Sequence, residues 1–359
     1  MNQPIETDNQ RRFDRVRVLV PGTGARFRCG GLSVALQTAR LLSRVRPTDV
    51  VTYVEREFQY PFLDELLKQE ESSDSVLWMV SWGFHVPKLL RRLQRHSVVY
   101  QAHSTGYGFD LPPGVPVVAV SRNTLGYWGN RAPRNPLFYV PNALEPHWLE
   151  RGNRSSKTKT RGVRRPIDVL VQQRKSSPYV LNSLVPILRA RGLIVEVQNG
   201  WVDDLVDLFN RSSVYLYDSA EYWRCMGLTE GFGLPPLEAM ACGCVVFSSM
   251  NHALADTLMP GITAHQLGCG SLEFDVHRII AAVNDPDQWH GSEVVIKQQL
   301  ETSSESYCLN RWNYVLHQLE QGLPYWSDQN HLLSSPPIAI IRFRAFIQRF
   351  RKFLSSCFR

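Results

Sequence analysis

The sequence has few of the features that hold secreted or membrane-spanning proteins together. Its 7 cysteines are an odd number, with no CxxC pair and no histidines at zinc-binding spacing. It contains no run of about 18 apolar residues, which excludes an obvious membrane-spanning helix. Residues 1–15 lack the apolar stretch of a signal peptide. We therefore expect a cytoplasmic protein in a reducing compartment, with Cys242 and Cys244 as small buried side chains.

Acidic residues are missing from two segments that carry much of the positive charge. Residues 151–165 contain seven lysines and arginines, and residues 329–359 contain six. Since the formal net charge of the whole chain is +7, the remainder sums to −6. A nucleic-acid-binding protein more often spreads its positive charge over a folded face, so this distribution argues against a nucleic-acid partner. A salt-dependent gel shift would reopen that possibility.

The body of the chain alternates short apolar runs with helical patterns. Hydrophobic residues make up 43% of the chain and charged residues 20%, a composition typical of globular proteins. The length of 359 residues is enough for about two domains. In the first half the expected strands lie at 16–20, 50–54, 76–80, 98–100, 115–120 and 137–140. Unbroken apolar strands separated by helices indicate a parallel sheet covered on both faces.

The basic segment 151–165 has no apolar residue before Val163 and is predicted to be a solvated linker or loop. Beyond it the strand and helix pattern begins again. We expect a first α/β domain over 13–150, a second over 166–322 and a linker over 323–337. Functional loops of open parallel sheets lie at the carboxyl ends of the strands, so a ligand is expected in the cleft between the domains.

The most specific stretch of the sequence runs from Glu230 to Gly243 and reads EGFGLPPLEAMACG. Its two prolines suit a first helical turn and Gly243 suits the position after the helix, so residues 231–234 are expected to form a loop at a helix N-terminus. Such a loop offers N–H groups and partial positive charge to an anion. Glu230 and Glu238 flank it, and carboxylates suit the hydroxyls of a sugar. Turn-forming glycines and solvated glutamates are the plainer alternative.

This stretch resembles the Glu-x7-Glu signature of the group 1 retaining glycosyltransferases, and the resemblance extends over about residues 16–320. It implies the GT-B fold, in which two Rossmann-like domains face each other across a cleft. It also implies that Glu230 contacts the transferred sugar, and that Glu238 holds the ribose of the nucleotide. Between them, the residues implied to line the sugar and diphosphate are Gly231, Phe232, Gly233 and Leu234.

Other positions match the same family more weakly. Gly30 and Gly31 fall where the family has a glycine loop over the diphosphate, although such pairs are common in turns. His103 matches the active-site histidine, and a polar histidine at a strand end is the alternative. Arg174 and Lys175 match the basic pair that neutralises the donor phosphates, and two solvated charges are the alternative. Adjacent residues of a strand point to opposite faces, so at least one of this pair must lie past the strand end.

The resemblance implies hexose transfer from a nucleotide-diphosphate sugar to an acceptor hydroxyl, with retention and without a cofactor. We expect no metal, because the only Asp-x-Asp sequence, at Asp285 and Asp287, reads as a turn that caps a helix. The basic pair and the helix N-termini would then stabilise the leaving phosphate. A sugar-nucleotide 2-epimerase and a catalytically silent sugar-binding scaffold remain alternatives. An incubation of donor with and without acceptor would separate the first from a transferase, and binding without turnover would indicate the second.

The segment 338–359 is predicted to form a basic amphipathic helix. At 100° per residue its aromatic and aliphatic side chains fall on one arc, and its six basic residues lie on the opposite side. Such a helix suits an anionic membrane surface, here the inner face of a membrane, which favours a glycan or lipid-linked acceptor nearby. Packing against the protein itself or against a partner protein is the alternative.

Overall fold

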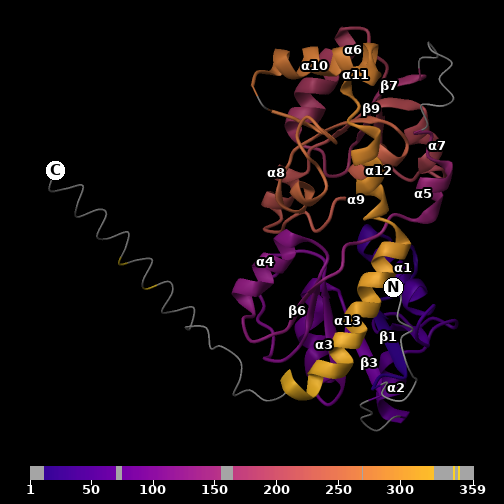
Figure 1. The fold of residues 1–359 in the computed structure, drawn as a ribbon, viewed down its shortest axis with the longest axis vertical. Coiled ribbons are helices and arrows are strands. Elements are labelled where there is room, and N and C mark those ends of the chain that lie inside the picture. Colours follow the sequence, from indigo (N-terminus) through magenta and orange to yellow (C-terminus); the bar gives the residue numbers. More distant parts are fainter. Residues whose placement is uncertain are drawn as a thin grey trace, which may run out of the picture.

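The computed structural model describes residues 12–69, 75–154, 165–268 and 270–326, together with Phe343 and Ile347. Two parallel β-sheets, each covered by helices, lie one above the other along the long axis of the molecule (Figure 1). The first sheet has six strands and the second has five. The expected pair of α/β domains with parallel sheets is therefore confirmed.

The first domain is built on the strand order β2-β1-β3-β4-β5-β6, and every pairing is parallel. Its strands are β1 (Arg15–Val20), β2 (Thr48–Thr52), β3 (Val76–Val80), β4 (Ser97–Ala102), β5 (Val117–Ala119) and β6 (Leu137–Tyr139). Its helices are α1 (Gly30–Leu42), α2 (Leu63–Gln69), α3 (Val86–Arg92) and α4 (Arg122–Arg131), with short turns η1 (Ala25–Phe27) and η2 (Gly83–His85). All five side chains of β3 are buried, which explains its unbroken apolar sequence.

The second domain has the strand order β11-β10-β9-β7-β8, again parallel throughout. Its strands are β7 (Ile167–Gln172), β8 (Val195–Gln198), β9 (Ser212–Tyr217), β10 (Val245–Ser248) and β11 (His265–Gln266). One face is covered by η4 (Tyr179–Leu184), α6 (Val185–Ala190) and α10 (Leu272–Asn284), and the other by α5 (Pro146–Arg151), α7 (Leu205–Asn210), α9 (Leu234–Ala241) and α12 (Glu293–Glu301). The remaining elements are α8 (Ala220–Cys225), η5 (His252–Asp256) and α11 (Pro286–Trp289).

The chain crosses between the domains at places that differ from the predicted boundaries of 150 and 322. Trp148 of α5 is buried in the core of the second domain, so the chain has left the first domain before that residue. The long helix α13 (Glu305–Trp326) returns to the first domain, where Figure 1 shows it beside the sheet. Trp312 and Leu316 of α13 are buried there with Val18 and Leu32. The apolar face of α13 completes the core over α1, a pairing too distant in sequence for a local pattern to show.

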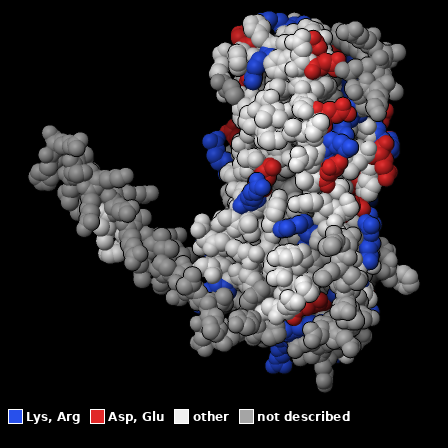
Figure 2. Space-filling view, in the orientation of Figure 1, with Lys and Arg blue, Asp and Glu red and all other residues white. Residues whose placement is uncertain are grey.

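Most of the basic segment 151–165 and of the C-terminal segment 323–359 lies outside the described residues, so their predicted roles remain predictions. No helix in the described part of the chain is long and apolar enough to cross a membrane. On the face in Figure 2, the described basic and acidic side chains lie side by side over both domains. Asp285 immediately precedes the short helix α11, in agreement with the expected turn before a helix.

Candidate functional site at the domain junction

The glycine loop has the local structure that its sequence predicts. Gly233 adopts the left-handed conformation (φ 85°) as the residue before α9, the two prolines lie in the first turn, and Gly243 (φ 71°) follows the helix end. Within the described residues, the main-chain N–H groups of Gly231, Phe232 and Gly233 have no hydrogen-bond acceptor. Three free donors beside the N-terminus of an eight-residue helix form a local environment suited to an anion.

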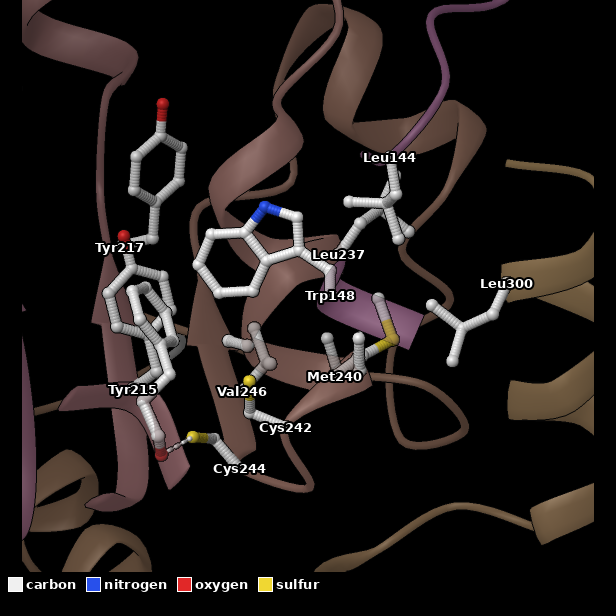
Figure 3. Packing of buried hydrophobic residues seen from close by; sticks show 14 of the residues in the cluster. Leu144, Trp148, Tyr215, Tyr217, Leu237, Met240, Cys242, Cys244, Val246 and Leu300 are labelled. Carbon is white, nitrogen blue, oxygen red and sulfur yellow. Dashed lines mark hydrogen bonds between the residues drawn. The ribbon is translucent and has the colours of Figure 1, made fainter. Parts of the chain in front are cut away.

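A tightly packed core holds α9 and its loop in place. Figure 3 shows Trp148 beside Leu237 and Met240 of α9, with Cys242, Cys244 and Tyr215 in the same cluster. The thiol of Cys244 donates to the main-chain oxygens of Phe209 and Ser212 at 3.2 and 3.3 Å. Burial raises the pKa of Cys242 and Cys244 to about 12, so both thiols stay protonated. They are the buried small side chains that the sequence predicts.

Glu230 stands directly before this loop and is only 4% exposed. Its Oε2 accepts hydrogen bonds from the hydroxyl of Tyr217 at 2.6 Å and from Nε1 of Trp223 at 2.8 Å. Its Oε1 lies 3.5 Å from Nζ of Lys175. Burial and the nearby Glu230 charge raise the pKa of Tyr217 well above its usual value, so the phenol keeps the proton that it donates. Both oxygens of this buried carboxylate are therefore engaged by the protein.

Arg174 and Lys175 both lie past the end of β7. This meets the condition that at least one of two adjacent residues must lie beyond the strand if both are to face the same site. Lys175 has φ 72°, a left-handed conformation that is uncommon for a lysine, and its ammonium lies 4.8 Å from the ring centroid of Trp223. Arg174 is exposed, and within the described residues its side chain has no hydrogen bond or ion pair. The two cations differ in that Lys175 contacts Glu230 and Trp223, whereas Arg174 has no partner among the described residues.

Glu238 projects from the first turns of α9 and is only partly exposed. Burial of its carboxyl group raises its pKa to about 7, and the charge of Lys175 acts in the opposite direction. Within the described residues its side chain has no hydrogen bond or ion pair. The charge of Lys175 thus acts on Glu238, while its ammonium contacts Glu230.

The first domain brings His103 to the same place. His103 follows β4, and a Cβ atom added at Gly231 would lie 1.6 Å from the His103 carbonyl oxygen, so the two main chains touch across the domain junction. Its Nε2 is buried and has no hydrogen-bond partner among the residues that the structure describes. Burial lowers the pKa of His103 to about 4, so the imidazole is neutral at pH 7. A neutral ring with an unused nitrogen can exchange a hydrogen bond with a bound molecule.

Gly30 and Gly31 form the first turn of the 13-residue helix α1, which has no acidic residue in that turn. Both are exposed, and a Cβ at Gly30 would meet no atom within 4 Å. Internal packing therefore does not require a glycine there, whereas close approach of a ligand would.

Sequence reasoning missed three residues that shape the site, namely Tyr217, Trp223 and Thr229. The first two donate to Glu230, and Thr229 contacts the first domain through Ser104 and Thr105. The helix α8, which carries Trp223, was not among the expected elements. No sequence signal identified these three residues, because their contacts join segments that only the folded chain brings together.

Part of the second domain is similar to a family of known proteins. Residues 192–288, which include the glycine loop and α9, match the family described as glycosyl transferases group 1. The second domain resembles the group 1 glycosyltransferases. No curated protein sequence gives a significant match to the chain.

Solved glycosyltransferase structures share the whole two-domain architecture, at low sequence identity. A glycosyltransferase from Rickettsia africae has a TM-score of 0.60 at 11% identity, covering 86% of this chain and 98% of its own. HepE from Anabaena, in complex with UDP and glucose, has a TM-score of 0.59 at 14% identity, covering 85% and 100%. Sucrose-phosphate synthase from Thermosynechococcus elongatus has a TM-score of 0.58 at 12% identity, covering 86% and 99%. The fold is GT-B, as the sequence predicted.

Proposed function

We propose that this protein is a glycosyltransferase that moves a hexose from a nucleotide-diphosphate sugar to an acceptor hydroxyl. The observation that carries the proposal is the glycine loop, with its three free N–H groups beside a helix N-terminus, together with two acids and a basic pair. The similarity of residues 192–288 to group 1 glycosyltransferases supports it. So does the solved structure of HepE, a protein of the same fold that was determined with UDP and glucose.

In the proposed reaction the bond between sugar and diphosphate breaks, leaving negative charge on the phosphate and positive charge on the sugar ring. The free amides of the glycine loop, with Arg174 and Lys175, would stabilise the leaving diphosphate without a metal ion. Gly30 and Gly31 would let the N-terminus of α1 approach it from the first domain. The transfer would proceed with retention of configuration, as the resemblance implies.

The remaining residues would bind and orient the sugar nucleotide. Glu238, whose carboxyl group has no protein partner among the described residues, would accept hydrogen bonds from the ribose. His103 offers an unpaired, neutral imidazole nitrogen to the sugar. Glu230 already accepts two hydrogen bonds and pairs with Lys175. It would contact the sugar from its position directly before the glycine loop. Phe232 is buried, so its main chain rather than its ring would face the ligand.

Ligand binding and turnover test the proposal directly. A thermal-shift screen with UDP, GDP and their hexose conjugates should show stabilisation by about 2.7 kcal/mol at 100 times the dissociation constant. Arg174→Ala, Glu230→Ala and Glu238→Ala should each lower turnover by about tenfold or more. Arg211→Ala, which removes an exposed cation whose one ion pair within the described residues is with Asp207, serves as the matched control. Wild-type turnover in all three site variants would refute the assignment.

We also propose that residues 338–359 bind an anionic membrane surface, close to a lipid-linked or glycan acceptor. The support is their amphipathic pattern of basic and aromatic residues. Removal of these residues should leave donor binding unchanged and should abolish co-sedimentation with vesicles that contain phosphatidylserine. Equal sedimentation of the two chains would rule out this role for the tail.

A further inference from the structure

Trp223 makes two different contacts in the candidate site, although no sequence signal pointed to it. It lies on α8, between the end of β9 and the glycine loop. Its indole N–H donates to Oε2 of Glu230 at 2.8 Å. The face of the same ring lies 4.8 Å from the ammonium of Lys175. One side chain thus holds both members of the Lys175–Glu230 ion pair.

The second contact bears on Lys175, whose position is unusual. It adopts φ 72°, a conformation that non-glycine residues retain only where their surroundings hold them in it. The ammonium lies 3.5 Å from Oε1 of Glu230, and its charge also acts on Glu238. A flexible lysine beside a buried carboxylate would be expected to pair closely with it and lose its availability to another anion. An aromatic face attracts the ammonium without neutralising it.

We propose that Trp223 is a positioning residue that keeps the Lys175 ammonium available to the diphosphate of the donor. The ring supports the cation from one side, and the indole N–H holds the Glu230 carboxylate by Oε2, so that Oε1 stays 3.5 Å from the ammonium rather than at the shorter distance of a hydrogen-bonded pair. The role depends on α8, because this helix carries Trp223 to the basic pair that follows β7. The inference rests on the proposed function, and it adds a residue that determines donor affinity.

The test is a double-mutant cycle on phosphate recognition. The quantity measured is the ratio of diphosphate to monophosphate affinity, for UDP over UMP and for GDP over GMP, by calorimetric titration. Trp223→Leu should lower this ratio about fivefold or more, and Trp223→Phe, which keeps the ring and loses the N–H, should lower it less. In the Lys175→Met background, Trp223→Leu should change it no further, because the two residues act as a unit.

Two control variants separate positioning from general stability. Phe274→Leu removes another aromatic ring of the second domain that lies 4.7 Å from a cation, Arg278, on α10 at the far end of the domain from the junction (Figure 1). Tyr217→Phe removes the other donor to Glu230 and leaves Lys175 on its aromatic face, so it measures the effect of losing one hydrogen bond to Glu230 by itself. Phe274→Leu should not change the affinity ratio, and Tyr217→Phe should lower it less than Trp223→Leu does.

Each outcome distinguishes the inference from the proposed function. If the wild-type protein binds a diphosphate while both Trp223 variants keep its affinity ratio, the inference is overturned and the proposed function stands. If Trp223→Leu still lowers the ratio in the Lys175→Met background, Trp223 does not act through Lys175 and the inference is again overturned. Absence of binding of either diphosphate to the wild-type protein would instead overturn the proposed function. Should Trp223→Leu fail to fold, Trp223→Phe supplies the decisive comparison.

Discussion

Two glycines in the candidate site have opposite structural requirements, although both are predicted to meet the donor. A Cβ at Gly231 would lie 1.6 Å from the His103 carbonyl oxygen, whereas a Cβ at Gly31 would find only ordinary contact, 3.7 Å from Sγ of Cys29. Gly31→Ala should therefore stabilise α1 by about 0.5–1 kcal/mol, because alanine loses less backbone entropy in a helix. It should also weaken diphosphate binding, since the methyl group blocks close approach of a phosphate.

The comparison with Gly231→Ala completes this prediction. That variant should lose both stability and donor binding, because the added methyl group must push the domains apart. Urea unfolding and calorimetric titration of UDP and GDP measure the two properties. If Gly31→Ala kept the wild-type affinity for both diphosphates, the N-terminus of α1 would have no role in binding the donor.

Glu238 gives the fold a pH dependence that can be measured without any ligand. Its pKa in the folded protein is about 7, above the value of 4.5 for an unperturbed glutamate. The folded state therefore binds this proton more tightly than the unfolded state, and the stability that it contributes is lost as the pH rises from about 5 to 7. In Glu238→Gln, which cannot ionise, that loss should be absent. Urea unfolding of both proteins at pH 5, 6, 7 and 8 tests this, and parallel curves would contradict it.

At the scale of elements, α13 shows what local patterns cannot predict. The sequence places a helix in this region and the structure confirms it, but the helix covers the first domain rather than the second. The polar contacts of α13 explain why it packs on the first domain. The side chain of Glu305 accepts from Gln37 at 3.2 Å, Arg46 pairs with Glu320 at 2.9 Å, and Arg311 donates to the carbonyl of Tyr139. These partners are more than 170 residues away along the chain.

The stability of the first domain should therefore depend on a residue near the end of the chain. Trp312 of α13 is fully buried against the first domain, and Trp312→Ala should lower the free energy of unfolding by about 3–5 kcal/mol. Tyr314→Ala, on the same helix with a side chain that is 53% exposed, should cost far less. Urea unfolding of both variants, followed by limited proteolysis of the first-domain loops, makes the comparison. Equal midpoints for the two variants would contradict the packing of α13.

The sequence predicted the six strands of the first sheet and the local structure of the glycine loop, since these depend on apolar periodicity and on glycine and proline positions. The short strand β11 of the second sheet was not predicted. It did not predict α8, a six-residue helix with no buried residue and hence no periodic apolar face. The donors around Glu230 escaped notice for a related reason. Tyr217 and Trp223 reach it from β9 and α8, and only the folded backbone shows that they converge on one carboxylate.

At the scale of the whole molecule, Thr229 of the second domain contacts three residues of the first domain beside the site. The carbonyl oxygen of Thr229 accepts from the Ser104 hydroxyl at 2.7 Å. Its own hydroxyl contacts that of Thr105 at 2.9 Å and the amide of Asn123 at 3.2 Å. A further contact, from the main-chain N–H of Arg122 to Asp256 at 2.6 Å, lies nearby at the N-terminus of α4. The position of His103 relative to the glycine loop depends on these bonds.

Thr229→Val should therefore loosen the junction without disturbing either domain. The substitution keeps the shape of the side chain and removes two hydrogen bonds, each contributing about 1 kcal/mol, while the main-chain contact with Ser104 remains. The population of open forms should rise, which would increase the radius of gyration in solution scattering and lower turnover more than donor affinity. Thr263→Val is the matched control, because that hydroxyl is buried within the second domain and accepts from the N–H of Met259. It should lower stability and leave the radius unchanged, so that an equal radius for Thr229→Val and the wild-type protein would mean that the main-chain contacts alone hold the domains closed.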